Sequence, residues 1–321
     1  MEIKVGSFSF AIRRHAGFFN VPRHEKKEFN QRHFHMFLQD LTVRVAPFAA
    51  RNADSESPVF LLDADQDNVL RAHECLAGID PHENDHRQTD DIDDLVRHIS
   101  ERLPWTGRFV VDLREMPSRG LDGNRSRECY DLWLPRIGRY FMQVALVVER
   151  RTAAIHVGFV PRAQTFEVEI PKELGGPWAY RRMVRRLDRF DPLGPRYWRG
   201  DLDSQSAKSV DWQQDHTKYR RRALAYRDWV SRIWGWNGRD TSTEYKTEFF
   251  SVLRYLKMHR ACAILRQAIV NSIESVFVAN RVRARVKMAG LRTAAEIENT
   301  IDKLERGAIS LGAAYKEIGV P

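Results

Sequence analysis

The sequence predicts an α+β fold, in which a mixed domain with a small sheet precedes a long C-terminal helix followed by short helices. Three observations lead to this prediction. Apolar residues recur at three- and four-residue steps within 90–103 and again from 249 to 277, which is the period of a helix. Short apolar runs at 109–113 and 165–170 are typical of strands. The 321 residues are 43% hydrophobic, which is enough to bury a core.

The N-terminal region, 1–88, contains the sharpest local motif of the chain. Carboxylates at positions one, three, five and twelve of segment 63–74 follow the order in which an EF-hand loop surrounds calcium. The oxygen donors would be Asp63, Asp65, Asp67 and Glu74. However, Asn68 stands where that loop needs glycine, and Arg71 supplies no oxygen and repels the ion. A solvated acidic turn therefore explains the motif better than a metal site.

The next region, 89–176, is predicted to be an α+β part of the chain. Thr89 and the acidic residues after it suit the N-terminus of a helix over 90–103, and Pro104 is expected to end that helix. Segment 130–148 is too apolar to be a loop, and its pattern leaves strands and helix open. Strands are expected at 109–113, 153–160 and 165–170, the last two as members of one sheet.

The region 177–240 is predicted to be basic and helical. Pro177 suits the first turn of one helix, and a second helix with interleaved Tyr and Trp is expected over 217–234. Basic residues on one helical face can neutralise phosphates while aromatic rings stack on bases. The predicted nucleic-acid contacts are Arg181, Arg182, Arg185, Arg186, Lys218, Arg220, Arg221 and Arg222. Solvated helix faces are the alternative explanation of these residues.

The last region, 241–321, is predicted to hold one long helix and a pair of short ones. Thr241 and Glu244 form a capping-box pattern, and no Gly or Pro follows until Gly290. A single helix from 244 to 288 would have about 45 residues and reach roughly 70 Å. Because that length exceeds what a compact domain needs, it indicates an elongated assembly subunit. The short helices are marked by Thr293 and Glu296, by Gly307 and by Ser310.

Motifs of known enzyme classes are missing from the sequence, which has no Walker loop, no GxSxG elbow and no HExxH pair. We therefore predict no catalytic residue, no cofactor and no metal. An enzyme whose site is assembled from dispersed residues stays open as an alternative. The start of the chain lacks a basic and apolar leader, and the three cysteines are far apart. We expect a cytoplasmic protein without a membrane partner.

The net charge of +9 and the pI near 9.6 bear on the choice of partner. A basic surface attracts polyanions, which makes DNA a plausible partner. Equally, a modest charge excess keeps a large assembly soluble. Charge alone therefore favours DNA binding only weakly.

The C-terminal segments carry a resemblance to a known family. The predicted long helix ends in Arg281-Val-Arg-Ala-Arg-Val-Lys287, and Gly290-Leu-Arg-Thr293 follows it. The chain then continues with Leu304-Glu-Arg-Gly307-Ala-Ile-Ser310 and Lys316-Glu-Ile-Gly319. This order over 241–321, a helix, a gap and a G-x-I-S helix pair, resembles the end of phage portal proteins. The resemblance implies that 89–176 is wing-like and that 177–240 is like a stem or clip. Two features differ from that family, because the chain is shorter than portal proteins commonly are and it is basic.

The resemblance implies a structural function rather than a catalytic one. Portal proteins form a closed ring, commonly of about twelve subunits, through which DNA is packaged and ejected. The implied partners are DNA, further copies of the chain, a terminase and head-tail adaptors, and the implied location is the virion as well as the host cytoplasm. The alternative from a different class is a basic nucleic-acid-binding protein of a mobile element or a defence system, which would act as a small oligomer.

Overall fold

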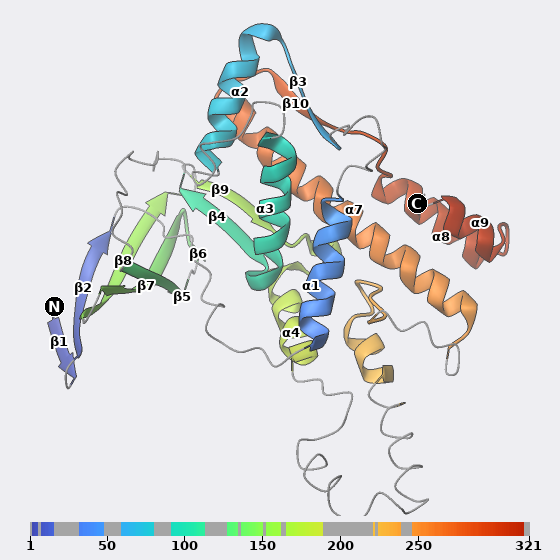
Figure 1. The fold of residues 1–321 in the computed structure, drawn as a ribbon, viewed down its shortest axis with the longest axis horizontal. Coiled ribbons are helices and arrows are strands. Elements are labelled where there is room, and N and C mark those ends of the chain that lie inside the picture. The colour runs from blue at the N-terminus through green and yellow to red at the C-terminus, as the bar shows by residue number, and fades with distance from the viewer. Residues whose placement is uncertain are drawn as a thin grey trace, which may run out of the picture. The chain divides into compact units, whose positions relative to one another are not determined.

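The computed structural model describes most of the chain in twelve stretches (Figure 1). They are residues 2–5, 8–15, 32–47, 59–79, 91–112, 127–133, 136–149, 152–161, 165–188, 221, 224–238 and 246–317. The chain forms two compact units. Unit 1 gathers Met1–Glu28, Ala49–Glu169 and Ala268–Ala289, and unit 2 gathers Phe29–Phe48, Ile170–Gln267 and Gly290–Pro321. Each unit is thus built from three separate stretches, whereas the four regions expected from the sequence are consecutive.

Unit 1 contains all the described strands together with two complete helices. The strands of its larger sheet are β1 (Glu2–Val5), β2 (Phe8–His15), β5 (Arg127–Trp133), β6 (Arg136–Ile137), β7 (Tyr140–Glu149) and β8 (Thr152–Pro161). The strands of its two small sheets are β3 (Phe60–Ala64), β4 (Arg108–Asp112), β9 (Thr165–Glu169) and β10 (Ala284–Met288). Its helices are α2 (Gln66–Ile79) and α3 (Asp91–Thr106). The prediction of an α+β fold is therefore confirmed.

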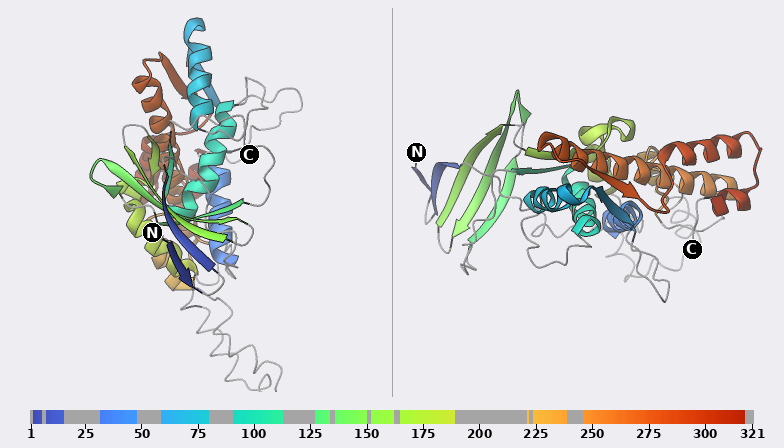
Figure 2. Two further views of the ribbon diagram at one scale, coloured as in Figure 1. Left: turned by 90° about the vertical axis from the view of Figure 1, so that its left-hand side faces the viewer. Right: turned by 90° about the horizontal axis from the view of Figure 1, so that it is seen from above.

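The larger sheet has the strand order β1-β2-β8-β7-β5, and β6 pairs with β7. All of its pairings are antiparallel except that of β2 with β8, which is parallel. Both views in Figure 2 show β2, β8 and β7 side by side in one twisted sheet. The apolar segment that the sequence left open is therefore made of strands β5 to β7.

Strand β9 lies outside the larger sheet, so the prediction that it shares a sheet with β8 is wrong. It pairs antiparallel with β4, with Phe109 opposite Val168 and Val111 opposite Phe166. The rings of Phe109 and Phe166 pack edge to face, 6.0 Å apart. Cross-strand contacts of this kind stabilise a sheet pairing, and they join residues that are too distant in the sequence to be matched by pattern alone.

Helix α3 forms as predicted but continues past Pro104 to Thr106. Its buried stripe contains Leu95, Val96 and Ile99, which recur at helical spacing. Proline lacks the N–H that a helix interior needs, so an ending at residue 104 was expected. In the last turn the missing bond is a small loss, and Gly107, with a φ of +74°, ends the helix instead.

Helix α7 (Glu248–Ala279) is shorter than predicted, so the expectation of one helix from 244 to 288 is wrong. Its 32 residues span about 48 Å. The Val282 N–H donates to the Phe277 carbonyl (2.8 Å), which is the longer-range bond of a Schellman motif. Arg281 takes the left-handed conformation, with a φ of +56°, that this motif usually gives to glycine. The end of α7 therefore has no glycine, which is the usual sequence signal for the end of a helix.

The chain after Arg281 returns as strand β10, which pairs antiparallel with β3. Arg285 and Lys287 are exposed, while Val286 between them is buried. This two-residue period is the pattern of a strand. The Val286 N–H also donates to the Glu274 carboxylate (3.0 Å). Gly290 consequently follows a strand rather than a helix. The helix is therefore shorter than the length from which an elongated assembly subunit was predicted.

The apolar residues of α7 are not confined to one side of the helix, as expected where a helix has neighbours on more than one side. Length and composition alone would also allow α7 to cross a membrane, but 56% of its most apolar 18-residue window is buried inside the protein. The core helix of a globular fold satisfies the same criterion.

Unit 2 contains the remaining helices and a core rich in aromatic rings. Its elements are α1 (Arg32–Val45), the 3-10 helix η3 (Lys172–Leu174), α4 (Gly176–Asp188), the first part of α7, α8 (Ala294–Glu305) and α9 (Leu311–Glu317). Phe37 of α1 contacts the rings of Tyr180, Trp234 and Trp236 at centroid distances of 6.4, 5.7 and 5.4 Å. All four side chains are buried. This cluster holds α4 and segment 231–236 in place.

Helices α8 and α9 are the predicted C-terminal pair, and the sequence signals for them are confirmed. Thr293 and Glu296 form a full capping box at the start of α8. Gly307, with a φ of +71°, follows the end of α8, and the Ser310 hydroxyl accepts a hydrogen bond from the Ala313 N–H at the start of α9 (3.2 Å). The two helices pack on α7 through a shared cluster of Val252, Leu256, Ala263, Ile297, Ile301, Leu304 and Ala314.

Candidate nucleic-acid interface

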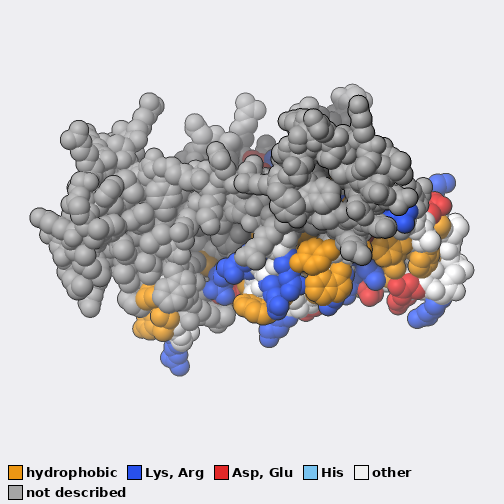
Figure 3. Space-filling view, turned by 90° about the horizontal axis from the view of Figure 1, so that it is seen from below, with side chains coloured by type: hydrophobic (Ala, Val, Ile, Leu, Met, Phe, Trp, Pro, Cys, Tyr) orange, Lys and Arg blue, Asp and Glu red, His pale blue; other side chains and the backbone are white. Residues whose placement is uncertain are grey.

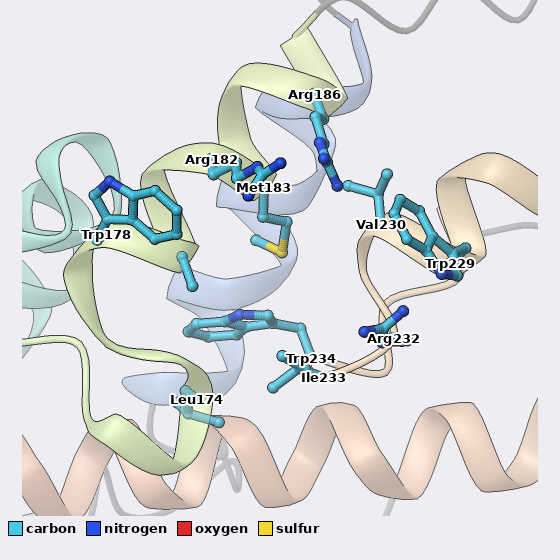
Figure 4. A pocket seen from close by; sticks show the side chains of 11 residues that line it. Leu174, Trp178, Arg182, Met183, Arg186, Trp229, Val230, Arg232, Ile233 and Trp234 are labelled. Atoms are coloured by element: carbon cyan, nitrogen blue, oxygen red, sulfur yellow. The ribbon is translucent and has the colours of Figure 1, made fainter.

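The candidate site lies in unit 2, between α4 and segment 224–234 (Figure 4). The turn before α4 contains Gly175, which has a φ of +92° and whose Cα approaches a neighbouring segment closely. A β-carbon at this position would lie 3.1 Å from the Ala179 Cβ and 3.8 Å from the Ile233 Cδ1. Glycine is therefore suited to this turn by its conformation and by its small size. The turn places Trp178 in the first turn of α4.

The opposite wall, residues 224–234, is held by a buried arginine of α7. Arg254 donates to the Asp228 carbonyl (3.0 Å), to the Ser231 hydroxyl (2.8 Å) and to the Trp236 carbonyl. Burial lowers the pKa of the Arg254 guanidinium to about 10, which still leaves it charged at neutral pH. Because these bonds reach residues 228, 231 and 236, Arg254 fixes the end of the helical residues 224–230, which include Trp229, and the turn after them, which includes Arg232.

A pocket of about 310 Å³ separates the two walls. Its apolar lining consists of Leu174, Ala179, Met183, Val230, Ile233 and Trp234. Trp178 and Trp229 stand at opposite sides of this lining, as Figure 4 shows. The remaining lining residues are Arg182, Arg186 and Arg232, and no described lining residue is acidic. The pocket is therefore apolar at its floor, aromatic at its sides and positively charged.

Each pocket arginine lies over an exposed tryptophan ring. The Arg182 Cζ is 5.5 Å from the Trp178 centroid, and the Cζ atoms of Arg186 and Arg232 are each 5.2 Å from the Trp229 centroid. These distances are those of cation–π contacts. A guanidinium stacked on a ring keeps its in-plane N–H donors available for other groups. The stacking therefore orders the arginines without using their hydrogen-bonding capacity.

The pocket is open to ligands, because its aromatic side chains are exposed and its cations are not engaged. Trp178 is 73% exposed and Trp229 is 50% exposed, whereas Trp234 at the floor is buried. Within the part of the chain that the structure describes, the guanidinium groups of Arg182, Arg186 and Arg232 form no ion pair and no hydrogen bond. In the space-filling view, basic side chains border hydrophobic ones on one face (Figure 3).

The predicted nucleic-acid contacts are only partly brought together. Arg182 and Arg186 line the pocket, while Arg181 and Arg185 are exposed on α4 outside its lining. Arg221 is helical and exposed. The other predicted contacts, Lys218, Arg220 and Arg222, lie outside the described residues.

Trp178 and Arg232 line the pocket but were not predicted from the sequence. Trp178 lies one helical turn before Arg182, and Trp229 lies three residues before Arg232. Side chains at these spacings meet on a helix surface. The helical spacing of Trp178 and Arg182 is therefore the signal that would have added Trp178, whereas Arg232 lies in the turn after helical residues 224–230 and has no such signal.

The acidic motif of the N-terminal region is distributed over two elements of unit 1. Asp63 lies in β3, where its carboxylate pairs with the Lys287 ammonium (2.9 Å), and Asp65 follows that strand. Asp67 and Glu74 lie in α2, so the segment is not an EF-hand loop. No three His, Cys, Asp or Glu side chains among the described residues are grouped as metal ligands would be.

Comparisons with known proteins do not identify a relative. No protein-family model matches the chain, and no curated protein and no solved structure matches it significantly. Its function must therefore be inferred from the chemistry of the pocket and from the pattern of its C-terminus.

Proposed function

We propose that this chain is a structural protein that contacts nucleic acid and assembles into a ring, as phage portal proteins do. In this proposal it handles DNA in a phage or phage-like particle, in the host cytoplasm and in the virion. Its further partners would be a terminase and a head-tail adaptor. The two parts of the proposal, nucleic-acid contact and ring assembly, are supported by different observations and are tested separately.

The observation that carries the nucleic-acid part is the group of three unengaged arginines on exposed tryptophans. Arg182, Arg186 and Arg232 place three positive charges around one pocket without a carboxylate among its lining residues. Phosphate is the natural partner of a planar guanidinium, because two N–H donors can meet two phosphate oxygens. A surface of this kind binds polyanions with an affinity that decreases steeply as salt is added.

Salt dependence tests this part directly. The affinity for a labelled DNA oligonucleotide would be measured by fluorescence anisotropy over a range of salt concentrations. The double variant Arg182→Ala/Arg186→Ala is expected to bind more weakly and to reduce the log–log salt slope by about one for each phosphate that the protein no longer neutralises. The control Arg292→Ala/Lys316→Ala removes two exposed charges elsewhere in unit 2. Equal slopes for the two variants would count against a specific role of the pocket.

The ring part is supported by the helices at the C-terminus. Among the residues on which the resemblance rests, Thr293, Gly307 and Ser310 stand at boundaries of α8 and α9, whereas 281–287 lie after α7 and enter strand β10. Phe249 and Phe250 of α7 are also exposed. Repetition of one heterologous contact between copies would close a ring.

Size-exclusion chromatography with light scattering tests the ring. A particle of about twelve copies supports the portal-like part of the proposal. A monomer or dimer that still binds DNA would instead favour a nucleic-acid-binding protein of a mobile element or defence system. Negative-stain images of the purified protein would show directly whether a central channel is present.

A further inference from the structure

We infer that the pocket holds an unpaired nucleotide, so that this site binds single-stranded nucleic acid in preference to duplex. The inference rests on the nucleic-acid contact proposed above and adds the form of nucleic acid that the site recognises. It combines three observations: an aromatic face that is open to solvent, a separate pair of cations, and a shallow apolar floor.

The open aromatic face belongs to Trp178. This side chain is 73% exposed, and only Arg182 stacks on it among the described residues. In a duplex each base face is covered by its neighbours, whereas an unpaired base can stack on an aromatic side chain. A large indole that points into solvent beside a pocket is thus a platform for a base that has left the stack.

The pair of cations flanks the other tryptophan. The Cζ atoms of Arg186 and Arg232 are each 5.2 Å from the centroid of Trp229. With two guanidinium groups at its ring, Trp229 is a support that orders both arginines. The two groups can approach one phosphate or two successive phosphates of the same strand. The pocket therefore has a base side at Trp178 and a phosphate side at Trp229.

The floor of the pocket limits what can enter. A volume of about 310 Å³ is at the lower end of the range of roughly 300–1,000 Å³ that small-molecule sites occupy. This is a space for one nucleotide rather than for a helix. The floor residues Ala179, Met183 and Ile233 offer no hydrogen-bonding side chains, so the edges of the base would be read weakly. Binding should consequently tolerate any base.

The experiment compares single-stranded and duplex DNA of equal length, using fluorescence anisotropy with homopolymeric and mixed strands. Wild-type protein is expected to bind the single strand about tenfold more tightly than the duplex, with little difference between mixed sequences. Trp178→Ala should remove most of this preference, and Trp178→Phe, which keeps an aromatic face, should retain it. Tyr315→Ala is the matched control, because Tyr315 is an exposed aromatic residue of unit 2 that does not line the pocket.

The outcomes separate this inference from the proposed function. If duplex and single strand bind equally and Trp178→Ala has no effect, the inference is overturned while nucleic-acid contact stands. If neither form binds at low salt, both fail. If polyglutamate competes as well as single-stranded DNA of equal charge, the pocket is a general polyanion site and the inference is again overturned. Circular dichroism and thermal unfolding of each variant confirm that the fold is retained.

Discussion

Tryptophan and arginine are used in two opposite ways within unit 2. Around Trp236, the arginines are buried, and the two terminal nitrogens of Arg254 donate three hydrogen bonds to the protein. Around Trp229, the arginines stack on an exposed ring and their donors are unengaged among the described residues. The two groups are the same in composition and differ in hydrogen bonding.

This difference separates a structural arginine from one that can bind a ligand. A buried guanidinium loses its water, so it must be satisfied by carbonyls or carboxylates of the fold. Arg266 shows the same behaviour, since it donates to the carbonyls of Val45 (2.8 Å) and Arg44 (2.6 Å) at the end of α1. An exposed guanidinium remains hydrated until a ligand replaces the water. Four predictions test whether the two groups really differ in this way.

The largest effect is expected for Arg254→Ala. This change leaves buried carbonyls of Asp228 and Trp236 without their donor. We expect the free energy of unfolding to fall by about 3–5 kcal/mol, measured by urea denaturation. Arg254→Lys keeps the charge but cannot make the three bonds, so its loss should be intermediate. A loss below about 1 kcal/mol for the alanine variant would show that this group is not structural.

A second large effect is expected where the same loop touches α7. Gly235 has a φ of +70°, and a β-carbon there would lie 2.4 Å from the Arg254 carbonyl oxygen and 2.5 Å from the Met258 nitrogen. Because these neighbours are backbone atoms, they cannot move aside easily. We expect Gly235→Ala to lower the free energy of unfolding by about 2–4 kcal/mol. Gly312→Ala in α9, which meets nothing within 4 Å, is the matched control and should be neutral or slightly stabilising.

Acid should destabilise the fold without changing the charge of the pocket. Burial, followed by the positive charges of Arg44 and Arg266, lowers the pKa of His259 from 6.5 to about 4. In the unfolded chain His259 takes up a proton near pH 6.5, but in the folded chain it takes up this proton only near pH 4. The contribution of His259 to stability is therefore complete above about pH 6.5 and is lost as the pH falls toward 4. The loss could reach about 3 kcal/mol.

Urea denaturation across that pH range checks this prediction. In His259→Gln the corresponding part of the pH dependence should disappear. The lining of the pocket contains arginine as its only titratable residue type, so DNA affinity should stay constant wherever the protein is folded. A DNA affinity that changes with the protonation of His259 would show that this histidine is coupled to the pocket.

The smallest effect on stability is expected for the pocket itself. In Arg186→Ala/Arg232→Ala the free energy of unfolding should change by no more than about 0.5 kcal/mol, because the side chains are at the surface. DNA affinity should nevertheless fall about tenfold, because two side chains that can neutralise phosphates are removed. A variant that unfolds more easily but binds DNA normally would reverse the distinction between the two groups.

Local signals in the sequence predicted several elements correctly. The capping box of Thr293 and Glu296 and the glycine at 307 marked α8, and Pro177 marked the first turn of α4. These features depend on residues within a few positions of one another, so a single sequence reveals them. The predicted arginines at 182 and 186 also belong to the site, because they are on the polar face of α4.

Features that depend on distant residues could not be predicted in the same way. The pairing of β4 with β9 and of β3 with β10 joins segments that are far apart in the chain. The contribution of Arg232 depended on how its loop folds against α7. The end of α7 was missed for a different reason, because Arg281 adopts a conformation usually taken by glycine, and the alternating pattern after it was not read as a strand.

The interleaving of the two units along the chain has a consequence for how the protein is made. Residues as far apart as Arg71 and Asn280, separated by 209 positions, must meet before unit 1 is complete. At a synthesis rate of about 5–20 residues per second, the earlier residue waits roughly ten to forty seconds for its partner. Unit 2 likewise waits for α8 and α9. Unit 1 is complete only at Ala289 and unit 2 only with α9, so most of the chain is made before either unit can finish folding, and both should need protection from aggregation until then.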